Sequence, residues 1–309
     1  QGHDIIRTWL FYTVLKSHLE HDSLPWTNAA ISGWVLDPER KKMSKSKGNV
    51  VTPMPLLEQY GADAVRYWAA SARLGADTAF DESQIKVGRR LAIKDLNASR
   101  FALSIEATEG TLTQALDRSV LRQLARAVEE ATRAFHAYDH ARALEVTERF
   151  FWSFCDDYLE LVKGRAYGAR GADAAASAVS ALRTALSVLL RMFGPFLPYV
   201  TEEVWSWWRE GSVHRAPWPS ETELAHVAEG ADPAALDVAA AVLGAVRKFK
   251  ALNKQSLRAR AERVVVRDTA ERLAILEAVA ADVREAGNIG RLETIEGDAF
   301  AVETTLAPD

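Results

Sequence analysis

Long stretches of apolar residues at helical spacing, in the middle of the chain, limit the possible folds more than any other feature of the sequence. Apolar residues recur there every three or four positions, which places them on one face of an α-helix. Four segments have this pattern: 83–105, 112–139, 140–168 and 172–208. Pro195 and Pro198 lie inside the fourth segment and should kink or break it. Four such helices with short connections predict an antiparallel helical bundle.

The residues before the bundle alternate between helical and extended patterns. Residues 5–19 have apolar positions on most sides, which predicts a buried helix. Residues 29–36 predict a strand, and residues 52–72 predict two short helices, of which Asp63 should cap the second. Residues 73–80, with a glycine among them, should form a linker.

The last third of the chain, after a proline-containing linker, predicts a small α/β module. The expected elements are helices at 233–253 and 269–286, a strand at 262–268, and two strands between 291 and 306. Together, these patterns predict a mainly α-helical chain of three domains. The domain boundaries are expected at 1–80, 81–225 and 226–309.

The composition excludes several classes of protein. Of the 309 residues, 48% are hydrophobic and 26% are charged, so a disordered, collagen-like or disulfide-rich chain is not expected. No apolar run approaches the roughly 18 residues of a membrane span, and Cys155 is the single cysteine. We therefore expect a cytoplasmic monomer without a membrane partner. The chain begins at Gln1 with dense hydrophobic pattern, so we expect it to be a piece of a longer protein.

The segment ERKKMSKSKGN at 39–49 concentrates positive charge in a chain whose net charge is -4. Gly48 and Asn49 suit tight, exposed backbone, so a loop is expected. Charge alone is compatible with a solvated surface, a localisation signal or a phosphate clamp. The order of residues favours the clamp, because lysines reach phosphate oxygens on long stems while serines and glycine supply hydroxyl and amide donors.

Residues 42–46, KMSKS, match in full the signature of the class I aminoacyl-tRNA synthetases. GHDIIRTW at 2–9 and YGADAVRYWAA at 60–70 resemble segments of the valine, isoleucine and leucine branch of that family. The resemblance implies that residues 1–80 are the C-terminal part of a Rossmann-type α/β catalytic domain. It also implies that the helical bundle is of the anticodon-binding type.

The resemblance implies roles for individual residues. Gly2 and Asp4 would approach the ATP ribose, and Trp9 would line the amino-acid pocket. The ATP-binding residues of the loop would be Lys42, Met43, Ser44, Lys45 and Ser46. Lys42 and Lys45 would be the catalytic pair, because with Mg²⁺ they would neutralise the charge of the leaving pyrophosphate. ATP with Mg²⁺ would be a substrate, and neither a tightly bound cofactor nor a protein metal site is expected.

Within the branch, VGRRLAIKDLNASRF at 87–101 most resembles the valyl-tRNA synthetases, although Asp95 stands where that family usually has an apolar residue. Residues 150–163 and 189–205 resemble later helices of the same anticodon-binding bundle. Valine, ATP and tRNA(Val) are therefore the expected partners. In the family, the first half of the nucleotide-binding fold and an editing domain precede Gly2. We therefore expect the C-terminal part of such an enzyme, inactive by itself in adenylate formation.

Two basic clusters are candidates for contact with tRNA phosphates. The first follows one stripe of the first bundle helix, and the second belongs to a segment with eight basic residues and one acidic residue between Arg247 and Arg267, a local net charge of +7. The candidate residues are Lys86, Arg89, Arg90 and Lys94, and Arg247, Lys248, Lys250 and Lys254. Two other functions stay open: a fragment of an isoleucyl-tRNA synthetase, and a non-catalytic tRNA-binding module.

Overall fold

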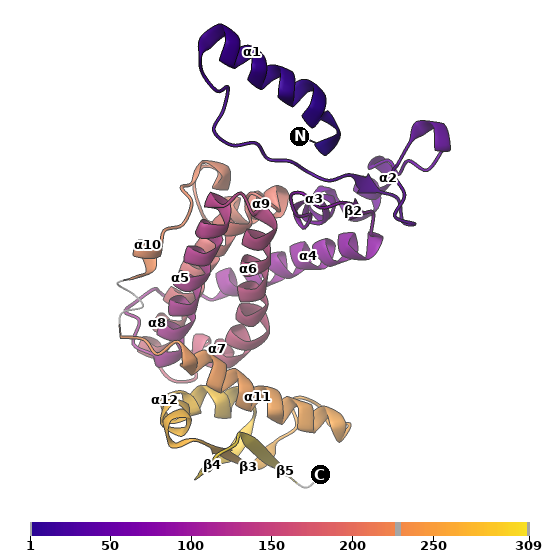
Figure 1. Ribbon diagram of the computed structural model, residues 1–309. Helices are drawn as coiled ribbons and strands as arrows, with labels where there is room; N and C mark the ends of the chain where they lie inside the picture. The colour runs from indigo at the N-terminus through magenta and orange to yellow at the C-terminus, as the bar shows by residue number, and fades with distance from the viewer. Residues whose placement is uncertain (1, 226–229, 308–309) are drawn as a thin grey trace. The chain divides into compact units, whose positions relative to one another are not determined.

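The computed structural model describes residues 2–225 and 230–307, which form two compact units (Figure 1). The first unit comprises the chain up to Leu96 together with Glu130–Val146 and Phe193–Arg215. The second unit comprises Asn97–Glu129, Thr147–Met192 and the chain from Ala216 onward. Each unit has buried apolar residues of its own.

The long helices predicted for the middle of the chain are present. They are α4 (Glu82–Ser104), α5 (Ala115–His136), α6 (His140–Ser153), α7 (Leu159–Ala166) and α8 (Ala172–Phe193). A π-helical turn, Phe154–Tyr158, joins α6 to α7, so the segment predicted as one helix is continuous but locally widened. The break predicted at the prolines is confirmed, because α8 ends before Pro195 and α9 (Pro198–Ser206) begins with Pro198.

Helix α8 corrects one expectation from the sequence. By length and composition it could cross a membrane, and it is the one such helix in the part of the chain that the structure describes. However, 72% of its most apolar window is buried inside the protein, and Ala178, Ala181 and Ala185 are fully buried. Small side chains let neighbouring elements approach closely, so core packing accounts for this composition.

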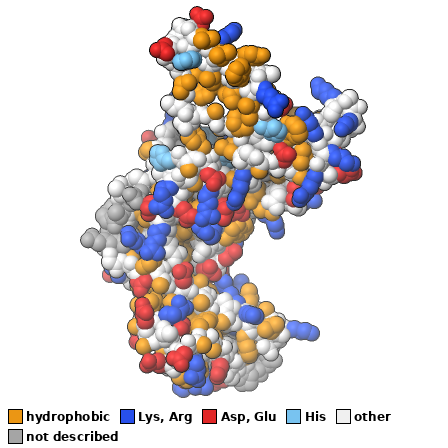
Figure 2. Space-filling view, viewed as in Figure 1, with side chains coloured by type: hydrophobic (Ala, Val, Ile, Leu, Met, Phe, Trp, Pro, Cys, Tyr) orange, Lys and Arg blue, Asp and Glu red, His pale blue; other side chains and the backbone are white. Residues whose placement is uncertain are grey.

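The first residues of unit 1 are helical, as predicted, but they are not buried. The 3-10 turn His3–Ile5, the π-helical turn Ile6–Leu10 and α1 (Phe11–His21) contain no buried residue. Their large apolar side chains are exposed, up to 71% for Leu19, and Figure 2 shows hydrophobic side chains gathered over α1. Apolar residues on most sides of a helix lead to burial only where other elements surround it, and within the described residues none does.

The strand predicted at 29–36 is shorter than expected. Regular pairing is limited to β1 (Val35–Leu36), which pairs in parallel with β2 (Thr78–Ala79) inside the predicted linker. Backbone contact continues outside the strands, since Gly75 N donates to Ile31 O at 2.8 Å. A Cβ atom on Gly33 would lie 2.2 Å from Ala76 O, so the two segments approach too closely for any residue but glycine.

The two short helices predicted at 52–72 are α2 (Met54–Tyr60) and α3 (Ala62–Ala70). The sequence predicted that Asp63 caps α3, and this prediction is wrong: Asp63 is buried and lies inside the first turn of α3, which has no side-chain cap. Its carboxylate instead accepts hydrogen bonds from Tyr199 N (3.1 Å) and Val200 N (2.8 Å), in the first turn of α9. Burial raises the pKa of Asp63, although these N–H groups act in the opposite direction. The residue therefore caps a helix that is distant in sequence.

The small α/β module predicted at the end of the chain is confirmed. It contains α11 (Ala234–Leu252), β3 (Ala261–Asp268), α12 (Ala270–Ala286), β4 (Ile289–Glu296) and β5 (Ala301–Leu306), after α10 (Glu221–Ala225). The sheet has the order β4-β3-β5, with β3 and β4 parallel and β5 antiparallel. Helices α11 and α12 lie together on one face of this sheet (Figure 1). The parallel pair follows from the crossover through α12.

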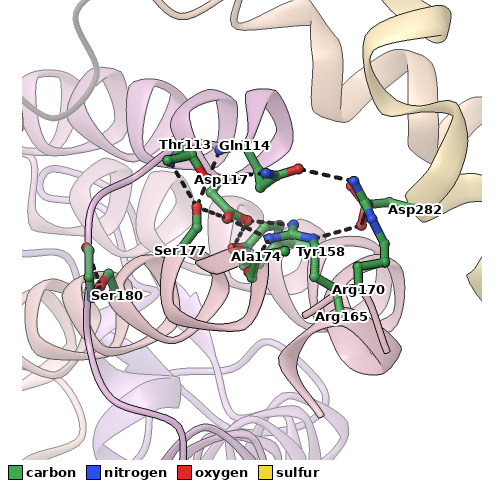
Figure 3. Close-up of polar contacts among 11 residues, drawn as sticks. Thr113, Gln114, Asp117, Tyr158, Arg165, Arg170, Ala174, Ser177, Ser180 and Asp282 are labelled. Atoms are coloured by element: carbon green, nitrogen blue, oxygen red, sulfur yellow. Dashed lines mark hydrogen bonds and ion pairs between the residues drawn. The ribbon is translucent and has the colours of Figure 1, made fainter. Parts of the chain in front are cut away.

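A buried ionic network joins this module to the helices of unit 2 (Figure 3). Arg165 of α7 is fully buried and donates to both carboxylate oxygens of Asp117 in α5, each at 2.7 Å. Its Nε donates to Asp282 of α12 at 2.8 Å. Tyr158 and Ser177 also donate to Asp117, at 2.7 and 2.6 Å. The network thereby connects α5, α7, α8 and α12.

The charges of the network compensate one another. Burial by itself lowers the pKa of Arg165, but the hydrogen bonds and charges of Asp117 and Asp282 outweigh burial and raise it. Burial, together with the charge of Asp117, also raises the pKa of Tyr158 well above its ordinary value. Arg165 is therefore held as a cation, and removing Asp117 would leave it with Asp282, which Arg170 also contacts, as its carboxylate partner in this network.

We expect Asp117→Ala to destabilise the chain by about 3–5 kcal/mol, because it breaks the buried ion pair and leaves both terminal nitrogens of the Arg165 guanidinium without their carboxylate partner. Urea unfolding followed by helical circular dichroism measures this loss. Arg291→Ala is the control, since Arg291 is 76% exposed and pairs with Glu293 at 3.8 Å; its effect should stay below about 1 kcal/mol. Equal unfolding midpoints for the two variants would contradict the assignment.

Candidate functional site

The lysine-rich segment folds into a loop between β1 and α2, as predicted. The backbone reverses at Arg40, whose φ is 63°, and Lys42 forms an isolated antiparallel bridge with Leu36. A single 3-10 turn, Lys45–Lys47, follows, and Gly48 then adopts the left-handed region with φ of 69°. Glycine enters this region at little cost, which explains its place at the end of the turn. Figure 2 shows Lys and Arg side chains gathered on this loop.

A carboxylate at the end of β1 organises the start of the loop. Asp37 is only 5% exposed, and its Oδ1 accepts hydrogen bonds from Glu39 N (3.0 Å) and Lys41 N (2.7 Å). Its Oδ2 accepts a hydrogen bond from Asn49 Nδ2 at 2.7 Å. The Lys41 N–H first, and then the Asn49 amide, hold the pKa of Asp37 below its ordinary value. The carboxylate therefore stays ionised while it supports the turn.

Lys42 lies beside the segment at the start of the chain. Its Nζ is 3.9 Å from the centroid of the Trp34 ring, a distance at which an ammonium ion is attracted to an aromatic face. The His3 ring is 4.5 Å from the same tryptophan, centroid to centroid. In addition, His3 N donates to Ser32 O at 3.2 Å. Two motifs that are 40 residues apart in sequence are thus brought together.

The candidate residues at the start of the chain, Gly2, Asp4 and Trp9, do not share one set of contacts. Gly2 pairs with Ser32 through an isolated parallel bridge, and Asp4 is exposed in the 3-10 turn that follows. Trp9 is 47% exposed and stacks on Trp26, with ring centroids 5.4 Å apart. The structure therefore places Gly2 next to the segment that leads into β1 and contains Trp34, while Trp9 contacts a different aromatic residue.

The loop carries two hydroxyl groups and exposed lysine side chains. Ser44 Oγ and Ser46 Oγ are 2.7 Å apart and share one hydrogen bond. Lys45 and Lys47 are exposed, and Met43 is half-buried. Lys41, in contrast, forms an ion pair with Glu39 at 2.5 Å. The loop thus presents Lys42, Lys45 and two hydroxyl groups, a set of donors that suits an anion with several oxygens.

Comparison with known families agrees with this arrangement. The family described as "tRNA synthetases class I (I, L, M and V)" matches residues 1–81. The family described as "Anticodon-binding domain of tRNA ligase" matches residues 117–266. The chain belongs to the class I tRNA synthetases. The first match contains the lysine loop, and the second contains most of the helical bundle and part of the C-terminal module of this synthetase chain.

Several proteins similar to the synthetase chain are valine–tRNA ligases. The valine–tRNA ligase of Thermobifida fusca is 59% identical over 315 residues, which is 100% of this chain and 35% of that protein. The valine–tRNA ligases of Salinispora arenicola and Leifsonia xyli are 54% and 53% identical, over 99% and 100% of this chain. The match covers 38% and 37% of those two proteins. The chain thus spans about a third of the length of these relatives.

A solved structure has a similar fold. It is the LeuRS of Agrobacterium radiobacter K84 in a ternary complex with tRNA and LeuAMS. The TM-score is 0.57 at 20% identity, and the match covers 96% of this chain and 36% of that protein. At this identity the likeness supports the fold alone.

The first basic cluster of the synthetase chain lies on α4 and is partly engaged with its own unit. Lys86 pairs with Glu82 at 3.0 Å, and Arg89 donates to Gln59 O. The Glu82 carboxylate also accepts the hydroxyl of Tyr60, which raises the pKa of Tyr60 and lowers that of Glu82. Lys86, Arg89 and Arg90 are exposed, whereas Lys94 is half-buried. The stripe predicted from the sequence is therefore accessible along most of its length.

The second basic cluster contains one residue that the structure removes from the candidates. Lys250 is 1% exposed, and its Nζ donates to Gly287 O (2.7 Å) and Leu257 O (3.1 Å). Burial lowers its pKa. Its ammonium group therefore supports the backbone between α11, α12 and the loop after α11, and a tRNA phosphate could not reach it. The sequence missed this because local charge does not show which lysines point inward.

The other residues of this cluster differ in exposure. Arg247 is half-buried, pairs with Glu160 at 3.2 Å and donates to Asp156 O. Lys248 and Lys254 are exposed. The two lysines are thus the accessible members of the predicted group.

Sequence reasoning also overlooked functional candidates that surround the loop. Trp34, Asp37 and Asn49 hold or contact the KMSKS segment, yet none was identified as a site residue. A signal existed at Asp37 and Asn49, since both are turn-forming residues next to the lysine run.

Among the described residues, no group of three His, Cys, Asp or Glu side chains could hold a metal ion.

We expect Lys250→Met to destabilise the chain by about 1–3 kcal/mol, because the buried carbonyl of Gly287 and the partly buried carbonyl of Leu257 lose their donor. Lys248→Met, two residues earlier on the same helix and exposed, is the matched control and should change stability by less than about 0.5 kcal/mol. Chemical denaturation of both variants provides the comparison. An unchanged midpoint for Lys250→Met would show that its ammonium group supports no structure.

Proposed function

We propose that this chain is the C-terminal part of a valine–tRNA ligase, which activates valine with ATP and transfers it to tRNA(Val). The observation that carries the proposal is the KMSKS loop, whose Lys42 lies 3.9 Å from Trp34 beside the Gly2–Asp4 segment. The names and high identity of the relatives support valine as the amino acid. In this proposal the three parts of the chain are 1–80, 81–225 and 226–309.

The proposed first step joins valine to AMP. The valine carboxylate attacks the α-phosphorus of ATP, the bond to the bridging oxygen breaks, and pyrophosphate leaves with the electron pair. Negative charge grows on the leaving group, so ammonium groups that meet it stabilise the transition state more than bound ATP. Lys42 and Lys45 are proposed for this role, with Ser44 and Ser46 as hydrogen-bond donors. In the second step the terminal ribose of the tRNA takes the valyl group and releases AMP.

In the proposal, Mg²⁺ binds to the triphosphate and not to side chains of the loop. The exposed donors of the loop are cationic or hydroxylic, and its one buried carboxylate, Asp37, is occupied by backbone and amide N–H groups. This donor set fits a metal ion that arrives bound to the triphosphate better than one held by protein ligands. Mg²⁺ would supply charge neutralisation on the phosphate oxygens, and the lysines would add to it.

The proposal also includes the oligomeric state: the enzyme acts as a monomer.

The proposal assigns tRNA binding to the basic surfaces of the helical bundle and the C-terminal module. The accessible residues are Lys86, Arg89, Arg90, Lys248 and Lys254. We expect these side chains to contact mainly phosphates, so binding should weaken steeply as salt concentration rises. The match to an anticodon-binding domain over residues 117–266 supports this assignment for Lys248 and Lys254, which lie inside the match.

The decisive test uses the full-length product of the gene that contains this sequence. In valine-dependent ATP–pyrophosphate exchange, we expect Lys45→Ala to lower kcat by roughly 100-fold or more, because a contact made mainly in the transition state is lost. The KM for ATP should change much less. Lys41→Ala is the matched control, since its ammonium group is already paired with Glu39, and it should keep the parental rate.

Other outcomes separate the alternatives. Exchange that depends on isoleucine and not on valine would make the parent an isoleucine enzyme. No exchange with either amino acid, together with salt-sensitive tRNA binding, would make the chain a non-catalytic tRNA-binding module. The chain of 309 residues, tested alone, should show no valine-dependent exchange.

A further inference from the structure

The side chains of Asp37 and Asn49 tie the two ends of the KMSKS loop to the end of β1. We propose that they are positioning residues for amino-acid activation, which fix the backbone that carries Lys42, Ser44 and Lys45. This inference rests on the proposed function, because it concerns the step in which the loop meets pyrophosphate. Neither residue would touch the substrate, and both would act through the loop.

Asp37 fixes the first half of the loop. Its two carboxylate oxygens accept three hydrogen bonds, from Glu39 N, Lys41 N and Asn49 Nδ2. Its backbone takes part as well, since Asp37 N donates to Lys41 O and Arg40 N donates to Asp37 O, both at 2.9 Å. An ionised carboxylate forms the stronger type of hydrogen bond. The turn that delivers the chain to Lys42 is therefore defined by one buried side chain.

Asn49 fixes the second half of the loop and connects it to the first. Its Nδ2 donates to Asp37 Oδ2 at 2.7 Å and to Lys42 O at 3.2 Å, while its Oδ1 accepts Ser44 N at 2.9 Å. Two acceptors therefore face its nitrogen and one donor faces its oxygen. This pattern fixes the orientation of the amide. Neither an aspartate nor a leucine could replace all three contacts.

The contacts of Asn49 hold the backbone of the KMSKS residues themselves. Lys42 O and Ser44 N, on either side of Met43, are both held by the same amide group. Ser44 O in turn accepts Lys47 N at 3.1 Å, and Lys45 O accepts Gly48 N at 3.2 Å, which closes the 3-10 turn. The path of the backbone from Lys42 to Gly48 thus depends on Asn49, and through it on Asp37.

A positioning role can be told apart from a merely structural one here, because the loop is exposed and the fold does not depend on it. Lys45, Ser46 and Lys47 are all exposed, so loss of the Asn49 contacts removes few buried interactions and should leave the fold intact. The cost appears instead as freedom of the backbone that carries the lysines. Lysine side chains on a mobile backbone are no longer held in place before negative charge develops on the leaving group. Such misplacement lowers the rate of adenylate formation.

The test uses Asn49→Ala in the full-length product of the gene, with valine-dependent ATP–pyrophosphate exchange as the assay. We expect kcat to fall about 10- to 100-fold, while the KM for valine stays within about twofold. The thermal midpoint should stay within a few degrees of that of the parent. Glu39→Gln is the control within the same turn, because the Glu39 side chain contacts only Lys41 among the hydrogen bonds described above, and it should keep the parental kcat.

Two further variants distinguish positioning from loss of structure. In a Lys45→Ala background, Asn49→Ala should lower kcat much less than in the parent, because residues that act through one another are not additive. The exchange of donor and acceptor, Asp37→Asn together with Asn49→Asp, restores an amide-to-carboxylate hydrogen bond between the two positions. It should recover part of the rate that Asn49→Asp alone loses by placing two carboxylates side by side.

Each result decides a different point. A parent protein without valine-dependent exchange would remove the proposed function, and the positioning role with it. An active parent whose Asn49→Ala variant has unchanged kcat would overturn the positioning role alone. Fully additive losses in the Lys45→Ala background, or a fall in kcat that matches a fall in the folded fraction, would also overturn it.

Discussion

The buried guanidinium of Arg165 is the interaction on which the order of the second unit depends. It has two aspartate partners, Asp117 in α5 and Asp282 in α12, and all three residues are buried. Charges in this position are favourable only while they compensate each other and their hydrogen bonds are complete. Apolar packing would let α12 take several positions against α7, whereas directional bonds to one guanidinium select one. We infer that the network fixes the position of the C-terminal module against these helices.

The KMSKS loop is ordered by the same means on a smaller scale. Asp37 and Asn49 replace a hydrophobic core with hydrogen bonds between side chains and backbone. Such contacts hold a loop at the surface without burying the lysines that it presents. Because the loop is exposed, water competes for these bonds, which limits the net stability that each one contributes. The arrangement thus gives the loop a defined resting position and leaves Lys42 and Lys45 exposed for the proposed contact with a leaving group.

The sequence predicted the long helices, the α/β module and the position of the loop, because apolar periodicity and turn residues are local signals. It failed where the answer depends on a distant partner. The short strand near Gly33 depends on the backbone at Ala76, and Asp63 caps α9 across 136 residues. Similarly, Lys250 belongs to a basic segment, but contacts with Gly287 turn it inward. The KMSKS residues were predicted from motif resemblance, whereas the hydrogen bonds by which Asp37 and Asn49 hold them were visible only in three dimensions.

Amide hydrogen exchange at Ser44 tests most directly whether Asn49 orders the loop. The Ser44 N–H donates to Asn49 Oδ1 at 2.9 Å, so it should exchange at least about tenfold more slowly than a free amide in the same sequence. Asn49→Ala should abolish this protection and leave the amides of α3 unchanged. Unprotected exchange at Ser44 in the parent protein, or equal protection in the variant, would contradict the account.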